Sequence, residues 1–218
     1  MHWTLAISAL AAAALAMPQR RQEESTSDIR TLTYNETVVF HHNLHRANHS
    51  SVNITWDEDL ASTAQKIADI CNFEHNMTVD GGNYGQNLAV GMPAENISYV
   101  ISDLFYNLEA PLFADNYNMA QPPIEDSFAW GHFTQLVWNS TTRVGCATQH
   151  CTSGVENAIG ISPHLTVCNY KSAGNVQSQY ASNIGEPLGH PIATWANSTG
   201  VPACELLDCT TTPAQNES

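Results

Sequence analysis

The chain has 218 residues, 43% of them hydrophobic, which is enough for one ordinary domain with a buried core. Seven Lys and Arg against 21 Asp and Glu give a formal net charge of -14, which argues against nucleic-acid binding and against charge-driven attachment to an anionic membrane. Apart from a shorter N-terminal stretch, no apolar run approaches the roughly 20 residues of a membrane span, so no integral membrane protein is expected.

The N-terminus has the features of a secretory signal peptide. Residues 1–16 are mostly apolar and end in the small-x-small site Ala14-Leu15-Ala16, although His2 replaces the usual basic residue. A buried N-terminal helix is the alternative. Arg20-Arg21 offers a dibasic cleavage site, and residues 17–30 are predicted to be a leader or pro-segment. The predicted location is therefore extracellular.

Cysteines and sequons agree with an exported chain. Six cysteines predict three disulfides, which can pair in 15 ways, and the absence of a C-x-x-C pair favours a structural role over redox or metal chemistry. They are Cys71, Cys146, Cys151, Cys168, Cys204 and Cys209. Eight N-x-S/T sequons predict glycosylation sites, at Asn35, Asn48, Asn53, Asn76, Asn96, Asn139, Asn197 and Asn216.

The first half of the chain has helical periodicity. A helix is predicted over residues 35–46, and the T-x-x-E motif at 55–58 is typical of a capping box that starts a second helix. Apolar residues recur at helical spacing over 60–71 and again over 97–108. The glycine-rich segment 80–85 between these stripes predicts a turn or loop.

The second half changes to short segments rich in strand-forming residues. Strands are predicted over 133–138, 143–148, 158–162 and 165–171. Three helices followed by three or four antiparallel strands indicate an α+β layered domain. Residues 181–218 are rich in Gly, Pro, Ser, Thr and Asn and are predicted to form a tail with a small disulfide loop.

Several motifs follow one another in a characteristic order over residues 37–176. They are His42-Asn43-Leu44-His45-Arg46-Ala47, Ile54-Thr55-Trp56-Asp57-Glu58-Asp59-Leu60-Ala61, Cys71-Asn72-Phe73-Glu74-His75, Tyr84-Gly85-Gln86-Asn87-Leu88-Ala89, Gly131-His132-Phe133-Thr134-Gln135-Leu136-Val137-Trp138, Val144-Gly145-Cys146-Ala147, Val167-Cys168-Asn169-Tyr170 and Gly174-Asn175. In the order and spacing of these motifs the chain resembles the CAP or SCP-domain superfamily, which contains cysteine-rich secretory proteins, venom antigens and pathogenesis-related class-one proteins.

The resemblance implies a fold and a disulfide pattern. Residues 31–180 are expected to form a three-layer α-β-α sandwich with a short antiparallel sheet. The implied pairs are Cys71 with Cys146 and Cys151 with Cys168, which leaves Cys204 with Cys209.

The resemblance also implies a central cleft lined by two His and two acidic residues. His75, Glu109 and His132 match three of these positions, and Gln86 stands where Glu is usual. His75, Glu109 and His132 would suit a divalent cation, Zn or Mg, although an amide at Gln86 removes a charge and a possible general base. The alternative is that hydrogen bonds among these four side chains simply hold the cleft together.

Lipid binding is a further implication of the resemblance. Some family members bind sterols through a mobile loop ahead of the second His, and here that loop carries six apolar side chains that could contact a ligand. They are Phe113, Tyr117, Met119, Ile124, Phe128 and Trp130. The alternative is that these residues cover the core of the domain itself.

The sequence thus favours a secreted protein that binds sterols or other lipids. A secreted effector or allergen-like module that binds an extracellular protein or peptide is the first alternative, and a metal-assisted hydrolase is the second. Because no G-x-S-x-G or H-E-x-x-H motif occurs and the cysteines are assigned to disulfides, no enzyme activity is expected.

Overall fold

The computed structural model describes residues 32–194. The predicted signal peptide, the leader, the Cys204–Cys209 loop and the sequons at Asn197 and Asn216 lie outside the described residues. None of the helices in the described part of the chain is long and apolar enough to cross a membrane.

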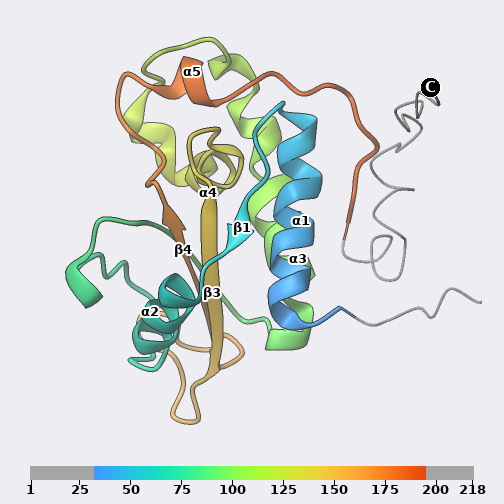
Figure 1. The fold of residues 1–218 in the computed structure, drawn as a ribbon. Coiled ribbons are helices and arrows are strands. Elements are labelled where there is room, and N and C mark those ends of the chain that lie inside the picture. The colour runs from blue at the N-terminus through green and yellow to red at the C-terminus, as the bar shows by residue number, and fades with distance from the viewer. Residues whose placement is uncertain (1–31, 195–218) are drawn as a thin grey trace, which may run out of the picture.

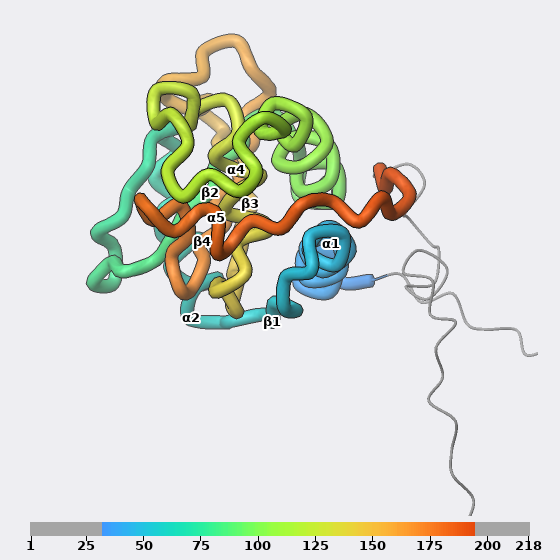
Figure 2. Tube along the Cα trace, turned by 90° about the horizontal axis from the view of Figure 1, so that it is seen from above, coloured from blue at the N-terminus to red at the C-terminus, as the bar shows by residue number. Residues whose placement is uncertain are grey.

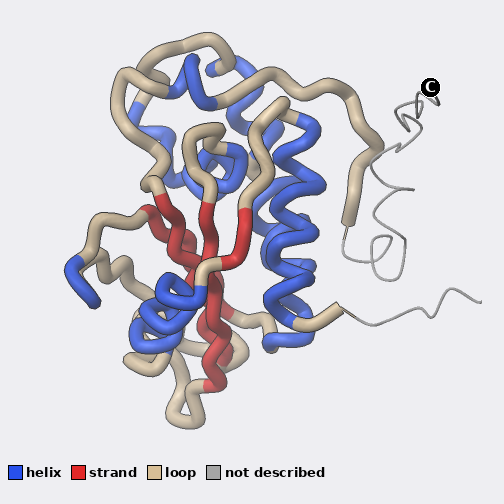
Figure 3. The backbone as a smooth tube through the Cα atoms, viewed as in Figure 1, coloured by secondary structure: helices blue, strands red, loops and turns tan. Residues whose placement is uncertain are grey.

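The described residues form an α-β-α sandwich, as predicted (Figures 1 and 3). Helix α2 covers one face of the sheet, and α1, α3 and α4 lie on the other side. The helices are α1 (Tyr34–Asn48), α2 (Glu58–Ala68), α3 (Ile97–Tyr99), α4 (Ser127–Val137) and α5 (Tyr180–Asn183), with α3 continued as a π-helix over Val100–Asn107. Short 3-10 turns occur at Val79–Gly81, Ala94–Asn96, Ala110–Asn116 and Ile124–Asp126.

The sheet has four strands in the order β1-β3-β4-β2. They are β1 (Thr55–Trp56), β2 (Gly85–Val90), β3 (Arg143–His150) and β4 (His164–Lys171). The predicted antiparallel arrangement holds for β3 with β4 and for β4 with β2, whereas the short β1 runs parallel to β3, so the sheet is mixed.

Each face of the sheet has its own hydrophobic core because side chains alternate along a strand. Val144 and Cys146 of β3 face the core shared with α1, the π-helix and α4. Ala147 faces the second core, on which α2 packs. Gly145 lets α2 approach closely, since a Cβ at this position would collide with the backbone nitrogen of Ala61.

The two disulfides among the described residues differ from the implied pairing. Cys71 is bonded to Cys151, and Cys146 is bonded to Cys168. The prediction was wrong because it joined cysteines on opposite faces of the sheet. Cys71 follows α2 and lies with Cys151 in the α2-side core, whereas Cys146 and Cys168 are directly opposite each other and face the other core.

Two predicted strands are wrong. Residues 133–138 belong to α4 and its C-cap, and 158–162 form turns. The first segment looks like a strand because it is rich in strand-forming residues, but all six of its side chains are at most 2% exposed. A helix buried on all sides has no polar face to reveal its period.

Helix starts also differ from the expected capping box. Thr55 lies in β1, and α2 is capped by Asp57, whose side chain accepts a hydrogen bond from the Leu60 N–H at 3.0 Å. A capping box does form at α1, where the Glu36 carboxylate accepts a bond from the Thr33 N–H. Strand β2 was not predicted as a strand, because its first five residues are all buried and show no alternation.

Helix α1 turns a row of histidines towards the interior. His41, His42, His45 and His49 are each at most 3% exposed. The Ser102 hydroxyl bridges His41 Nδ1 and His45 Nε2, both at 2.7 Å. These contacts fix α1 against the π-helix, and burial lowers the pKa of all four imidazoles.

Arg46, also on α1, is completely buried. Its five N–H groups donate to five backbone carbonyls, at 2.7 to 3.5 Å, on Val52, Leu136, Trp138, Asn139 and Thr141. Two of these carbonyls end α4, where the helix dipole is negative and attracts a cation. The guanidinium therefore joins α1, the C-terminus of α4 and the turn before β3.

Residues 184–194 run alongside α1 rather than away from the domain (Figure 2). The Leu188 N–H donates to Asn48 O at 2.7 Å, and the His190 N–H donates to Asn48 Oδ1 at 3.0 Å. His49 Nδ1 donates to Gly185 O at 2.7 Å. The segment is thus bonded to the last turn of α1.

Replacement of Arg46 by Met is expected to destabilise the fold strongly. Met retains most of the apolar stem but leaves buried carbonyls without donors, at about 1–3 kcal/mol for each unsatisfied group. We expect the free energy of unfolding in urea to fall by at least about 3 kcal/mol.

Arg143→Met is the control for this prediction. The Arg143 side chain is 59% exposed and pairs with Asp57 at 3.2 Å, so its loss should change the free energy by less than about 1 kcal/mol. Arg46→Lys keeps the charge with fewer donors and should fall between the two. If Arg46→Met, Arg46→Lys and Arg143→Met all lowered the free energy of unfolding by a similar small amount, the Arg46 contacts would be dispensable.

Acidification is expected to destabilise the fold through the buried imidazoles. Burial lowers the pKa of His41 to about 4 and that of His42 to about 3, whereas an unfolded His binds a proton near pH ~6.5. Below that pH the unfolded state binds more protons. Stability is therefore complete above about pH 6.5 and falls towards pH 4, by up to ~1.4 kcal/mol per pH unit for each such His.

Urea unfolding between about pH 7.5 and pH 5 measures this dependence above the range where most carboxylates titrate. His41→Gln should give a shallower slope than the unaltered chain. A free energy of unfolding that is constant over this range would contradict the prediction.

Candidate functional site

The predicted cleft residues come together in two hydrogen-bonded pairs. His132, on α4, has Nδ1 2.6 Å from Glu109 Oε1. The other Glu109 oxygen accepts a bond from the Phe133 N–H at 3.0 Å. The Phe105 ring stacks on the His132 imidazole, with ring centroids 4.8 Å apart. Glu109 and Phe105 together fix the orientation of His132.

Gln86, on β2, holds the second imidazole. Its Oε1 lies 3.0 Å from His75 Nδ1 and accepts a bond from the Asn76 N–H at 3.1 Å. Its Nε2 donates to Asn76 O at 3.3 Å and to Asn169 Oδ1 at 3.0 Å. The amide therefore makes all four bonds open to a Gln side chain. A carboxylate here could accept the first two but could not donate the others.

Both imidazoles line one cavity of about 230 Å³. Since Nδ1 of each ring is bonded to Glu109 or Gln86, Nε2 is the atom that remains for a ligand. The other lining residues are Gln86, Asn87, Ile124, Ser127, Phe128, Gly131, Asn175 and Tyr180. Glu109 does not line the cavity; it lies behind His132.

Three of the lining residues were not predicted as site residues: Asn87, Asn175 and Tyr180. A signal was present for two of them, since Asn87 and Asn175 lie in motifs that carry the family resemblance. The Asn87 amide donates to His132 O at 3.1 Å, and that of Asn175 donates to Gly131 O at 2.9 Å. Both amides therefore hold the α4 backbone at the cavity wall.

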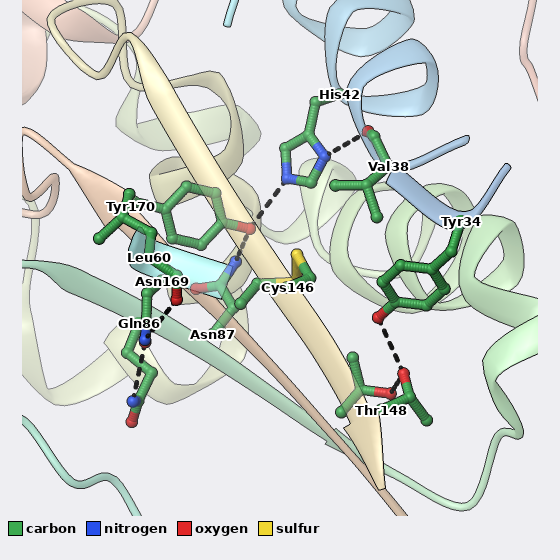
Figure 4. Close-up of a disulfide and its surroundings, with 12 residues drawn as sticks. Tyr34, Val38, His42, Leu60, Gln86, Asn87, Cys146, Thr148, Asn169 and Tyr170 are labelled. Atoms are coloured by element: carbon green, nitrogen blue, oxygen red, sulfur yellow. Dashed lines mark hydrogen bonds between the residues drawn. A yellow bond between two sulfur atoms is a disulfide. The ribbon is translucent and has the colours of Figure 1, made fainter. Parts of the chain in front are cut away.

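The Asn87 amide also continues into the core beneath the cleft (Figure 4). It donates to the Tyr170 hydroxyl at 3.3 Å. That hydroxyl lies 2.9 Å from His42 Nε2, and His42 Nδ1 donates to Val38 O. The Tyr170 hydroxyl therefore donates to His42, which is consistent with a neutral imidazole. A continuous polar path thus joins α1 to the cleft.

The structure divides the six predicted lipid-contact residues into two groups. Phe113 and Trp130 are core residues, 0% and 1% exposed, and Tyr117 packs against the same core. Met119 and Ile124 are about half exposed, at 45% and 48%, and Phe128 is 95% exposed. Only Ile124 and Phe128 line the cavity.

The structure does not assemble the three predicted metal ligands as one group. Both Glu109 oxygens are engaged, by His132 and by the Phe133 N–H, so this carboxylate positions an imidazole rather than facing the cavity. Across residues 32–194, no group of three or more His, Cys, Asp or Glu side chains could hold a metal ion. Of the three predicted metal ligands, only the two imidazoles line the cavity.

A larger cavity of about 370 Å³ lies between α2 and residues 80–84. Its charged side chains include Lys66 and Asp80, which bond to each other at 2.8 Å, and Thr63 also donates to Asp80. Since these three side chains are bonded to one another, a ligand would have to break these bonds to use them.

The predicted glycosylation sites have different surroundings where they are described. Asn53 is exposed, whereas the Asn48 amide donates to the Tyr106 hydroxyl at 2.8 Å and its oxygen accepts the His190 N–H. Asn76 Oδ1 accepts a bond from the Thr78 hydroxyl of its own sequon. Glycosylation of these residues stays a prediction.

Comparison with known proteins identifies the family. The model for CAP, the cysteine-rich secretory protein family, matches residues 39–170, and the chain belongs to this family. The crystal structure of Na-ASP-1 has a TM-score of 0.51 at 17% identity, covering 83% of this chain and 50% of that one, and supports the fold alone.

Curated relatives include several fungal proteins. A probable pathogenesis-related protein of Arthroderma benhamiae is 44% identical over 161 residues, which cover 74% of this chain and 52% of that protein. Protein PRY2 of Saccharomyces cerevisiae is 34% identical, with 69% and 41% covered. Secreted protein RBT4 of Candida albicans is 33% identical, with 74% and 43% covered. The chain thus matches about half or less of the length of these relatives.

Gln86→Glu is expected to destabilise the fold rather than improve the cleft. The two Nε2 donors would become carboxylate oxygens facing Asn76 O and Asn169 Oδ1, and each lost bond leaves a group unsatisfied, at about 1–3 kcal/mol. We expect a lower free energy of unfolding in urea near neutral pH.

The exposed Gln179→Glu serves as control and should change this free energy by less than about 0.5 kcal/mol. Stability of Gln86→Glu equal to that of the unaltered chain would mean that the amide donors contribute nothing there.

Proposed function

We propose that the protein is a secreted CAP-family binding protein that holds a sterol or a similar flat lipid at the histidine cleft. The observation that carries the proposal is the exposed Phe128, which stands with Ile124 beside the two cleft imidazoles. An almost fully exposed Phe at the edge of a cavity gains by burial against an apolar ligand, at about 25 cal/mol per Å² of apolar surface.

The size of the cleft defines how such a ligand would sit. At about 230 Å³ it is smaller than the cavities that enclose drug-sized ligands, roughly 300–1,000 Å³. The polar end of the ligand, such as a sterol hydroxyl, would enter and bond to an imidazole Nε2. The apolar body would lie outside on Ile124 and Phe128. Phe113 and Trp130 play no part in this arrangement, because both are in the core.

Secretion is part of the same proposal. It is supported by the signal-like residues 1–16, by the disulfides among the described residues and by the name of the secreted relative in Candida albicans. The predicted divalent cation also stays a proposal. Two imidazole nitrogens suit zinc, whereas magnesium takes oxygen ligands.

Phe128→Ser is expected to weaken binding of radiolabelled cholesterol to the purified protein. Burial of one Phe side chain is worth about 1.5–3 kcal/mol, so the dissociation constant should rise by roughly tenfold or more. The free energy of unfolding should not change, because the side chain is 95% exposed.

Ile159→Ser is the matched control. Ile159 is 97% exposed and lies outside the cleft lining, so this variant should bind cholesterol as the unaltered chain does. Equal binding by both variants would exclude the cleft edge as the lipid site. Capture of a peptide instead of lipid, or substrate turnover lost in His132→Ala, would favour the alternative functions.

A further inference from the structure

A second pair of imidazoles lies at the opposite end of the sheet. His150 ends β3 and His164 begins β4, and the two residues are directly opposite each other in the antiparallel register. Their ring centroids are 4.7 Å apart, with an angle of 31° between the rings. Neither residue lines the cleft.

The strand geometry explains why these rings meet. Cys146 and Cys168, on the same two strands, are 4.1 Å apart at Cα, close to the ~4.5 Å of a non-hydrogen-bonded pair. This type of pair recurs at every second residue along the strands, so His150 and His164 form another one. Side chains approach most closely in such pairs, and both rings project from the same face of the sheet.

The pair is separate from the cleft and open to solvent. His164 lies five residues along β4 from Asn169, the partner of Gln86, which corresponds to about 17 Å of strand. His150 is exposed and His164 is partly buried. Within residues 32–194 the only side-chain hydrogen bond of the pair joins His164 Nδ1 to the Ser162 hydroxyl at 3.1 Å.

We propose that His150 and His164 form a two-histidine chelating site for a borderline divalent transition-metal cation, with Cu²⁺ bound most tightly. Imidazole nitrogen is a preferred ligand of copper and zinc, and Cu²⁺ has the highest affinity of the common divalent ions for nitrogen sites. In the tautomer that binds the cation through Nε2, Nδ1 carries the proton and donates it to the Ser162 hydroxyl, 3.1 Å away. Water fills the remaining positions.

Chelation requires a small adjustment of the rings. Metal–nitrogen bonds of about 2.0–2.1 Å place two ligand nitrogens on one cation roughly 3 Å apart. Rotation of the exposed His150 ring about χ2, a broad torsion, can achieve this without movement of the strands. The site therefore needs no third protein ligand and no change of fold.

Titration of CuCl₂ into the full chain tests the site. Because the cleft imidazoles could also bind copper, the experiment uses a His75→Gln, His132→Gln background that removes them. In this background we expect one saturable copper site by calorimetry, with nitrogen couplings in the electron paramagnetic resonance spectrum. Adding His150→Gln or His164→Gln should weaken binding by roughly tenfold or more.

Circular dichroism is used to check that each variant is folded. We expect His150→Gln to fold because His150 is exposed. Ser162→Ala, which removes only the orienting hydroxyl, should produce a smaller loss. Copper binding that is unchanged by both His150→Gln and His164→Gln overturns the proposal. So does a background variant that binds no copper while the unaltered chain does, because the metal would then be held by the cleft.

Discussion

The buried guanidinium of Arg46 is the contact on which the arrangement of the helices depends. A fully desolvated cation is unfavourable unless its donors are satisfied and its charge is balanced. Here all five donors reach backbone carbonyls, and the negative end of α4 supplies much of the balance. Since α4 also carries His132, Arg46 sets where one half of the cleft lies.

The second constraint is that the α1 histidines remain neutral, and hydrogen bonds connect one of them, His42, to the cleft. His42 must keep Nε2 free of a proton to accept the Tyr170 hydroxyl, and Tyr170 must then accept the Asn87 amide. Asn87 in turn holds the carbonyl of His132. Protonation of His42 would turn Nε2 into a donor, so the buried Tyr170 O–H would lose its acceptor and the path would be disturbed. The network that stabilises the core therefore also supports the cleft.

Local periodicity was sufficient for the elements with one solvent-facing side. Residues 35–46 and 97–108 were predicted correctly as helical because their patterns matched one period. The buried strand β4 was predicted from its strand-forming residues and not from a period. Two other elements that are buried on every side have no such period: residues 133–138 belong to α4 and not to the predicted strand, and β2 was not predicted. Local pattern does not report how the surrounding layers cover an element.

The local sequence pattern also could not predict which side chains meet in the disulfides and in the cleft. Which cysteines meet depends on the face of the sheet that each one occupies, and a one-residue difference reverses the face. The cleft residues were predicted from the family resemblance, and the alternative in which hydrogen bonds hold the cleft together describes the contact of Glu109 with His132. The second bond of Glu109, from the Phe133 N–H, could not be predicted because it depends on the turn of chain that brings Glu109 behind His132. The orienting amides of Asn87 and Asn175 likewise come from distant strands and loops.

Position 86 suits Gln better than Glu because two neighbouring groups are hydrogen-bond acceptors. Asn76 O and Asn169 Oδ1 both need donors, which an ionised carboxylate does not have. The carboxylate of Glu109 is enclosed behind an imidazole. What faces a ligand is therefore imidazole nitrogen and amide, next to the apolar side chains of Ile124 and Phe128. In a chain with a net charge of -14, this surface suits a neutral ligand with one polar end better than a charged one.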